Sequence, residues 1–406
     1  MVEVSGADTA WILTSSALVL FMTPGLALFY GGMVRAKNML AMLMRNYVAM
    51  GVVTILWVAI AASLAFSGNE MSGMIGNLGL VGLKGIGLGN ETYGYSIPDS
   101  LFLMFQLMFA IITPALIAGA VAERMKFSAW VAFIAIWIVV VYAPMAHWVW
   151  GGGFIATNVG AVDFAGGLVV HINAGAAALA LVLVLGPRIG WGKSVIRPHS
   201  LPLTIAGAGI LWFGWFGFNA GSALGANGLA AQAFMTTHVA AAVAATAWII
   251  AETISGGKPT TLGFVSGAVA GLVAITPAAG FVNIMGAVII GIAAGFICFG
   301  ALRLKTMFKF DDSLDVIAVH LVGGIIGALL LGILADPAVN ELATGGMEQL
   351  TKQAISVVIA FVYSFVVSFV IAKVLDMLIG IRVTETEERA GLDVSLHEEQ
   401  SYVMAE

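Results

Sequence analysis

The sequence predicts an all-α membrane protein with eleven transmembrane helices, arranged as an inverted repeat of two five-helix halves followed by one long final helix. The first observation is composition: 60% of the 406 residues are hydrophobic and only 10% are charged, with a mean hydropathy of +1.02. These values exclude an ordinary soluble domain of this length. The other two observations are an alternation of basic loops along the chain and a histidine motif that occurs twice.

Eleven apolar segments are long enough to cross a bilayer, whose hydrocarbon core requires about 20 helical residues. We place their boundaries at charge clusters and at breaks rich in Gly, Pro and Asn. The 50 glycines of the chain indicate close contact between the helices, as small residues allow in lipid. The predicted spans are residues 9–32, 39–66, 99–122, 128–149, 164–185, 200–221, 229–253, 261–278, 283–302, 313–335 and 351–380.

Basic residues alternate with these spans, and cytoplasmic loops of membrane proteins are enriched in Lys and Arg. Loops after even-numbered spans hold Lys84 and at most Lys352, which stands at the start of the last predicted span. We therefore expect the N-terminus outside and the C-terminus inside a plasma or inner membrane. The fourteen basic residues that follow odd-numbered spans are Arg35, Lys37, Arg45, Arg124, Lys126, Arg188, Lys193, Arg197, Lys258, Arg303, Lys305, Lys309, Arg382 and Arg389.

Neither end of the chain predicts a separate soluble domain. The first residues, MVEVSGADTAW, contain acids but no basic residue, so we expect a short mature tail rather than a secretory signal. Residues 381–406 are polar and acidic, which predicts a cytoplasmic tail after a membrane domain of residues 1–380. Cys298 is the only cysteine, so no intrachain disulfide can form.

One motif occurs in both halves. VVHINAG (169–175) and AVHLVGG (318–324) share Val-His and a glycine four residues after the histidine. Each follows an aspartate, Asp163 in the first half and Asp312 or Asp315 in the second. The motifs fall in spans 5 and 10, and a unit of five spans reverses its orientation when it is repeated. We therefore expect halves at about 9–185 and 200–335, with a site between them near the midplane.

His171 and His320 lie well inside their spans. Ionisable groups at membrane depth are costly and usually mark the path of an ion, a proton or a substrate. A structural interpretation is two core histidines, each bonded to a neighbouring helix. Their matched positions favour function, with the rings hydrogen-bonded to each other and largely uncharged. Structural roles are expected for the remaining histidines, His147, His199, His238 and His397.

No metal, cofactor or nucleic-acid partner is expected. A haem held between His171 and His320 would need basic residues near its propionates, and the sequence has none at membrane depth. A metal site built on cysteines is excluded by the single Cys298.

Seven strings carry a family resemblance: MTPGLALFYGGMVRAKN (22–38), AERMKFSAW (122–130), APMAHWVWGGG (143–153), DFAGGLVVHINAG (163–175), GWFGFNAGSALGAN (214–227), ITPAAGFV (275–282) and DDSLDVIAVHLVGG (311–324). In this order they resemble the ammonium transporter (Amt/Mep/Rh) family, most closely its microbial Amt branch. The resemblance implies eleven spans, an inverted repeat, a homotrimer with one narrow pore in each protomer, and no enzymatic activity.

The resemblance also implies roles for individual residues. His171 and His320 match the twin histidines that line the pore. The other matches are a gate of Phe109 and Phe218, an outer cation site of Trp150, Ser222 and Phe105, the carboxylate Asp163 that stabilises this site, and Trp215 near the histidines. We expect ammonium to be recruited by the outer site, deprotonated, and passed along the histidines as ammonia.

Simpler interpretations exist for several of these residues. Phe105 and Phe109, at i and i+4, have the spacing of packing partners on one helix face. Asp163 precedes an apolar run and is expected to cap helix N–H groups whatever its other role. Ser222 is also suited to small-residue packing.

Two departures from the family pattern bear on function. His238 stands where many relatives carry Asn, which leaves open what span 7 contributes to the outer region. The tail string LHEEQSY (396–402) only partly matches the usual closing motif, which weakens the case for signalling between protomers through the tail. A cytoplasmic PII signalling protein is a possible partner, although basic inner loops also follow from topology alone.

Two other functions share this fold. An ammonium sensor tends to carry a fused signalling domain, and the short tail here favours transport instead. A Rhesus-like channel would pass neutral gas, whereas Trp150 and the Phe105/Phe109 pair favour the ammonium branch by resemblance.

Overall fold

The computed structural model describes residues 2–402, and all of its regular elements in that range are helical. The α-helices are α1 (Gly6–Met33), α2 (Met39–Leu56), α3 (Ala62–Phe66), α4 (Asp99–Ile117), α5 (Phe127–Trp137), α6 (Ala143–Val149), α7 (Asn173–Leu185), α8 (Leu201–Gly221), α9 (Gly228–Ile254), α10 (Thr261–Ile275), α11 (Ile284–Ala301), α12 (Leu304–Met307), α13 (Gly323–Leu334), α14 (Met347–Ile379), α15 (Glu385–Ala390) and α16 (Leu392–His397). Short 3-10 or π segments are η1 (Ala36–Asn38), η2 (Trp57–Ala61), η3 (Val81–Leu83), η4 (Ile138–Tyr142), η5 (Ile155–Val159), η6 (Gly167–Ile172) and η7 (Ile317–Val322).

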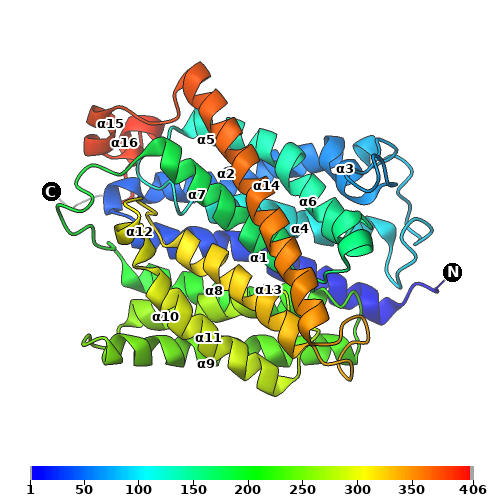
Figure 1. Ribbon diagram of the computed structural model, residues 1–406. Coiled ribbons are helices and arrows are strands. Elements are labelled where there is room, and N and C mark those ends of the chain that lie inside the picture. Colours follow the sequence, from blue (N-terminus) through cyan, green and yellow to red (C-terminus); the bar gives the residue numbers. More distant parts are fainter. Residues whose placement is uncertain (1, 403–406) are drawn as a thin grey trace.

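The two halves of the chain form two sides of one bundle. Helices α2 to α6 lie along one side and α9 to α11 along the other, with α1 and α8 between them (Figure 1). The long helix α14 crosses diagonally over both halves and packs on α5, α7 and α13.

Ten helical segments of the described chain are long and apolar enough to span a membrane. The predicted span 261–278 differs, because α10 ends at Ile275 after 15 residues and the chain continues in turns to residue 282. Pro277 lies in these turns and has no N–H with which to extend the helix. The helical part of the predicted spans 164–185 and 313–335 begins only at Gly167 and Ile317, after loops that contain Asp163 and Asp312.

Polar residues begin several of the helices and glycines end two of them. The side chains of Ser5, Asn227, Thr260 and Asn283 accept hydrogen bonds from the first-turn N–H groups of α1, α9, α10 and α11. At the other ends, Gly186 and Gly380 adopt φ values of +73° and +64° and stop α7 and α14.

Small residues bring α1 and α8 into close contact. A Cβ atom on Gly207 would lie 2.3 Å from the backbone N of Phe29, and one on Gly25 would lie 2.5 Å from the side chain of Ile210. Real Cβ atoms do not approach that closely, so these two glycines set the distance between the helices. The contact agrees with the close packing that the glycine content predicts.

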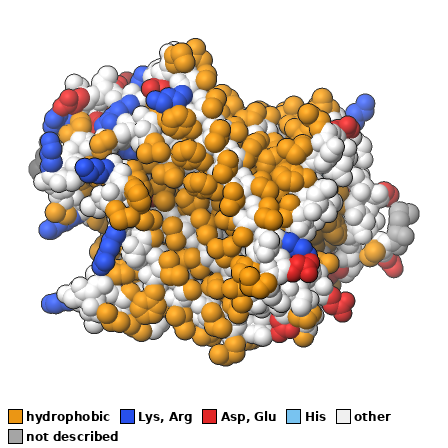
Figure 2. Space-filling model, viewed as in Figure 1, with side chains coloured by type: hydrophobic (Ala, Val, Ile, Leu, Met, Phe, Trp, Pro, Cys, Tyr) orange, Lys and Arg blue, Asp and Glu red, His pale blue; other side chains and the backbone are white. Residues whose placement is uncertain are grey.

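The surface divides into an apolar belt and two polar ends. Hydrophobic side chains cover the middle of the face in Figure 2, and most of its Lys and Arg side chains gather at the end that carries α12, α15 and α16. We call this the basic end. The tail is folded against it: the Asp393 carboxylate accepts hydrogen bonds from the N–H groups of Leu40 (3.1 Å) and Ala41 (2.9 Å) at the start of α2.

Candidate functional site

His171 and His320 both lie in π-helical segments, η6 and η7. Ahead of η6, both carboxylate oxygens of Asp163 accept backbone hydrogen bonds. The four donors are the N–H groups of Gly166 (2.8 Å), Gly167 (2.7 Å), Leu168 (2.7 Å) and Val169 (3.2 Å). The predicted capping role of Asp163 is therefore confirmed, and the cap holds the segment that carries His171.

The two imidazole rings contact each other directly, as the ring-to-ring hypothesis predicts. Their Nδ1 atoms lie 3.2 Å apart and their planes differ by 22°. Both side chains are buried, with 1% and 3% of their surface exposed. In such a pair one Nδ1 donates and the other accepts, so one ring presents a bare Nε2 and the other an Nε2–H. The site thus offers one acceptor and one donor to a small polar molecule.

The glycine of each motif explains how the rings meet. A Cβ atom on Gly175, four residues after His171, would lie 2.6 Å from the backbone N of Leu321, beside His320. A Cβ atom on Gly324, four residues after His320, would lie 3.0 Å from the Ile172 side chain and 3.2 Å from the Cβ of His171. The two segments cross where each lacks a side chain, and this crossing brings the histidines into register.

Aromatic rings enclose the histidine pair. Trp215 stacks on His171 with a centroid distance of 5.5 Å, and its Nε1–H donates to the Thr276 hydroxyl at 2.9 Å. Phe218 lies 6.1 Å from His171 and 4.4 Å from Phe109 between ring centroids. A cavity of only about 10 Å³ touches both histidines, and its other lining residues are apolar or aromatic. We call it the histidine chamber.

A larger cavity of about 210 Å³ lies beyond the phenylalanine contact; we call it the Trp150 cavity. Phe109 lines this cavity and Phe218 lines the histidine chamber, so the contact between their rings separates the two spaces. Ser222 Oγ donates to the Phe218 carbonyl (2.8 Å), which leaves its lone pairs free to accept from a ligand. The full lining is Tyr95, Phe102, Phe105, Gln106, Phe109, Val149, Trp150, Phe164, Ser222 and Leu224.

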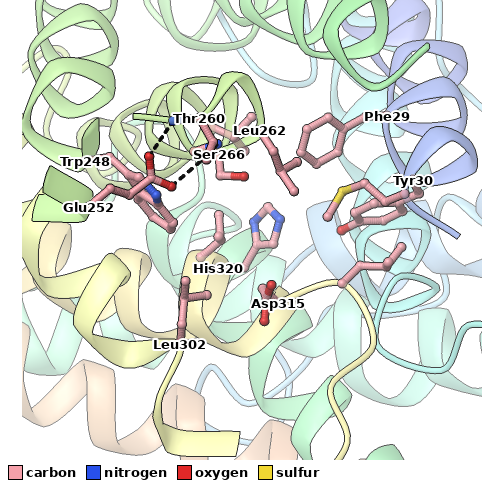
Figure 3. Close-up of a pocket in the computed structure, with 15 residues that line it drawn as sticks. Phe29, Tyr30, Trp248, Glu252, Thr260, Leu262, Ser266, Leu302, Asp315 and His320 are labelled. Atoms are coloured by element: carbon pink, nitrogen blue, oxygen red, sulfur yellow. Dashed lines mark hydrogen bonds between the residues drawn. The ribbon is translucent and has the colours of Figure 1, made fainter. Parts of the chain in front are cut away.

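A third cavity, of about 120 Å³, meets the far side of the pair, and we call it the Asp315 cavity. Figure 3 shows the His320 ring at its centre, with Glu252 and Ser266 to one side and Tyr30 to the other. His320 also lines the histidine chamber, so the three spaces form a series, with the phenylalanine contact at one boundary and the His320 ring at the other. Asp315 pairs with Lys305 on α12.

Near the Asp315 cavity, buried charges join loops from both halves. Arg188 donates to Asp311 through Nε (2.8 Å) and lies 3.3 Å from Glu123, which also pairs with Arg35 at 2.8 Å. Burial alone would raise the pKa of Glu123, but the guanidinium groups of Arg188 and Arg35 hold it below its usual value. The same balance of burial against Arg188 and Arg124 lowers the pKa of Asp311.

Comparison with known proteins decides the family. A sequence model of the Ammonium Transporter Family matches residues 10–402. The chain belongs to this family. It is 48% identical to the "Ammonium transporter" of Mycobacterium tuberculosis over 434 residues, covering 98% of this chain and 91% of the relative. It is 46% identical to "Ammonium transporter Amt1" of Archaeoglobus fulgidus, covering 98% of this chain and all of the relative.

Solved structures of relatives superimpose over almost the whole chain. Mep2 of Saccharomyces cerevisiae matches with a TM-score of 0.88 at 34% identity, covering 95% of this chain and 89% of the yeast chain. A structure described as "Sensor Amt Protein" matches with a TM-score of 0.89 at 31% identity, covering 96% of this chain and 98% of the sensor chain. An all-helical membrane protein of the Amt/Mep architecture, as predicted, is therefore confirmed.

Eight of the nine predicted pathway residues line the Trp150 cavity or the histidine chamber. Asp163 is the one that lines none of them; it contacts the site through Trp150, whose indole N–H donates to the Asp163 carbonyl at 2.9 Å. Sequence analysis missed the cavity-lining residues Tyr95, Gln106, Glu252 and Tyr30. Tyr95 lies in an irregular loop without periodicity, whereas Glu252 sits at the end of a predicted span, where an acidic residue was a detectable signal.

The other histidines lie outside the cavities. His147 Nδ1 is bonded to the Ala65 carbonyl (3.0 Å), and His199 bridges the Val34 carbonyl and the Tyr402 hydroxyl. His238 packs against Trp212, with 5.5 Å between ring centroids, and does not line the Trp150 cavity.

Proposed function

We propose that this protein transports ammonium across a cell membrane, through a pore formed by the Trp150 cavity, the histidine chamber and the Asp315 cavity. The single observation that carries the proposal is the buried, hydrogen-bonded pair of His171 and His320 between two cavities. Membership of the Ammonium Transporter Family supports the substrate.

The Trp150 cavity is the recruitment site in this proposal. Its aromatic faces attract a small cation with about 0.5–2 kcal/mol per well-placed ring. The Ser222 oxygen accepts a hydrogen bond from the cation, which favours ammonium over K⁺ because K⁺ has no proton to donate. Asp163 orders the loop that holds Trp150 and adds a fixed negative charge near the site.

Passage through the histidine chamber is expected to require deprotonation. Carrying a bare charge through an apolar membrane interior costs from about 3 kcal/mol to 10 kcal/mol or more on different scales. Removing a proton from an amine of pKa about 10 at pH 7 costs roughly 4 kcal/mol. Deprotonation is therefore competitive, and it rejects K⁺, which has no neutral form.

The histidines would solvate ammonia in the chamber. The ring with a bare Nε2 accepts from ammonia and the ring with Nε2–H donates to it, so the pair satisfies both kinds of hydrogen bond without ionising. The Nδ1–Nδ1 contact also gives the proton released by ammonium a route from one ring to the other.

We further propose eleven spans, namely the ten long apolar helices together with the shorter α10. At 1.5 Å per residue, its 15 residues extend about 22 Å, and the turns up to residue 282 supply the remaining depth. The cavity series then runs from an outer Trp150 cavity to an inner Asp315 cavity, with the N-terminus outside and the basic end inside. A homotrimer, and a PII-type protein docking on the basic end, are proposed from family resemblance.

The deciding experiment measures charge moved per ammonium by the purified protein in proteoliposomes. We expect an ammonium-driven current that excludes K⁺, and its loss or altered selectivity in His171→Ala and His320→Ala. His238→Ala is the matched control, since it removes an imidazole outside the cavities. Currents and K⁺ exclusion that are unchanged in both pore variants would contradict the role of the histidines.

A sensor is the second candidate, favoured by the match to "Sensor Amt Protein". Because 98% of that sensor chain is covered by the match, domain content does not separate the two functions. Saturable ammonium binding without any flux into the liposomes would identify a sensor. Flux of ammonia without current would instead identify a neutral gas channel.

A further inference from the structure

Each histidine is preceded by an aspartate at the same distance. His171 is the eighth residue after Asp163, and His320 is the eighth residue after Asp312. The Asp312 carboxylate accepts a hydrogen bond from the N–H of Ile317, the first residue of η7, at 2.7 Å. Asp315, the other candidate from the sequence, pairs with Lys305 instead. The inverted repeat therefore extends to the capping carboxylates.

The two capping aspartates differ in how many hydrogen bonds their carboxylates accept. Both oxygens of Asp163 are occupied by backbone N–H groups, whereas Asp312 Oδ1 is buried without a hydrogen-bond partner among residues 2–402. Asp312 as a whole is only 2% exposed. Buried polar atoms are usually hydrogen-bonded, so a half-used carboxylate at this position requires an explanation.

The surroundings make this carboxylate expensive to ionise. Burial is the main cause, and the nearby Asp315 the second, of the rise in the pKa of Asp312 to about 6. Lys305 and the Ile317 N–H act in the opposite direction and lower it. Tyr30 of α1 and Arg124 from the loop after α4 also face it. At neutral pH the protein thus keeps a buried negative charge whose protonation would favour the folded state.

We propose that Asp312 is a positioning residue for His320, whose ionised carboxylate holds the start of η7 and thereby keeps the ring in register with His171. The physical reason is that a negative charge binds the exposed N–H groups at a helix start more strongly than a neutral side chain does. The transport test of this inference rests on the proposed function. The structural test by NMR does not.

The structural test uses nitrogen NMR of protein labelled with ¹⁵N-histidine. We expect the signals of the hydrogen-bonded Nδ1 pair in the wild type, their loss in Asp312→Ala, and their partial retention in Asp312→Asn, which keeps an acceptor oxygen. Unchanged ring signals in Asp312→Ala would overturn the proposal, whether or not the protein transports ammonium. Asp336→Ala is the control, because its carboxylate accepts from the Ala338 N–H in the loop after α13, at the other end of this helix from His320.

The functional test compares currents of the wild type and Asp312→Asn between pH 5 and 8 at constant ammonium. We expect roughly a tenfold advantage of the wild type at pH 7.5, in line with the cost of small misplacements in other sites. The ratio should fall towards one below pH 6, as the wild-type carboxyl takes up its proton. A ratio that is independent of pH would overturn the role of the charge.

Thermal unfolding in detergent separates positioning from general stabilisation. Because ionisation of Asp312 is costly, Asp312→Asn is expected to be at least as stable as the wild type at pH 7.5 while transporting less. Should Asp312→Ala fail to fold, the Asn variant carries both tests. If the unfolding midpoint of Asp312→Asn at pH 7.5 falls below that of the wild type, so that unfolded protein accounts for the lost transport, the proposal is contradicted.

Discussion

The indole N–H of Trp150 donates a hydrogen bond to the backbone carbonyl of Asp163, 2.9 Å away. The same aspartate binds four backbone N–H groups at the start of the segment that carries His171. One residue therefore connects the wall of the Trp150 cavity to the histidine pair. In the proposed pore, Asp163 would thus act on the Trp150 cavity through its backbone and on the histidine pair through its carboxylate, although it lines neither space.

Replacement of Asp163 by Ala is expected to abolish transport and to destabilise the protein. The change leaves four N–H groups without their acceptor, and an unsatisfied buried group costs about 1–3 kcal/mol. The measurements are ammonium current and the midpoint of thermal unfolding. Asp336→Ala, an exposed cap, should change neither, and wild-type current in Asp163→Ala would refute the connection.

Ser222→Ala should weaken ammonium binding while leaving the fold intact. A hydrogen bond to a charged group such as ammonium contributes about 1.5–3 kcal/mol, so the apparent affinity is expected to fall roughly 13- to 160-fold. The half-saturating ammonium concentration of the current reports this change. Ser16→Ala is the matched control, because Ser16 Oγ likewise donates to the carbonyl four residues earlier but lies on α1 outside the cavities. An equal effect in both variants would exclude a specific role for Ser222.

Gly175→Ala tests the close contact between α7 and η7. Its Cβ would lie 2.5–2.7 Å from Leu321, so we expect about 1–3 kcal/mol of destabilisation together with loss of K⁺ exclusion as His320 shifts. Gly209→Ala is the control, since nothing lies within 4 Å of its added Cβ. If the two variants behave alike in unfolding and in K⁺ flux, close contact at Gly175 does not set the register.

Arg188 should be a major contributor to stability at neutral pH. Replacing it with Leu leaves Glu123 and Asp311 buried without their shared cation, a change that typically costs about 3–5 kcal/mol. Exposed Arg197 has no ion pair among the described residues, so Arg197→Leu should have little effect. Detergent-solubilised variants compared by thermal unfolding give the difference.

The same cluster predicts a pH dependence of its own. The pKa values of Glu123 and Asp311 are lower in the folded protein than in the unfolded chain. Their contribution to stability is therefore complete above pH about 4.5, the ordinary range of these carboxyl groups, and is lost as the pH falls through the lowered folded pKa values. Unfolding midpoints measured from pH 7 down to pH 3 should fall less steeply in Arg188→Leu, which lacks the pairing.

Many features of this protein follow from short stretches of its sequence. Long apolar runs specify helices because in lipid a helix satisfies its backbone hydrogen bonds within one segment, and ten of the eleven predicted spans are long, apolar helices in the structure. The matched motifs around His171 and His320, each with its glycine, indicated the repeat and the histidine pair. Ionisable residues inside apolar runs are conspicuous, which is why these two stood out.

Contacts between distant segments were decided only by the tertiary structure. The choice of Asp312 over Asp315 as the second cap depends on Lys305, which claims Asp315, and Tyr95 reaches the Trp150 cavity from a loop without any pattern. The tail reads as a polar segment but docks on α2 through Asp393. Sequence alone determined which segments form long apolar helices, because hydrophobicity acts on each segment separately. The tertiary structure decided which polar groups of these segments meet. Segments from the two halves cross at Gly175 and Gly324, where the lack of side chains lets the backbones approach.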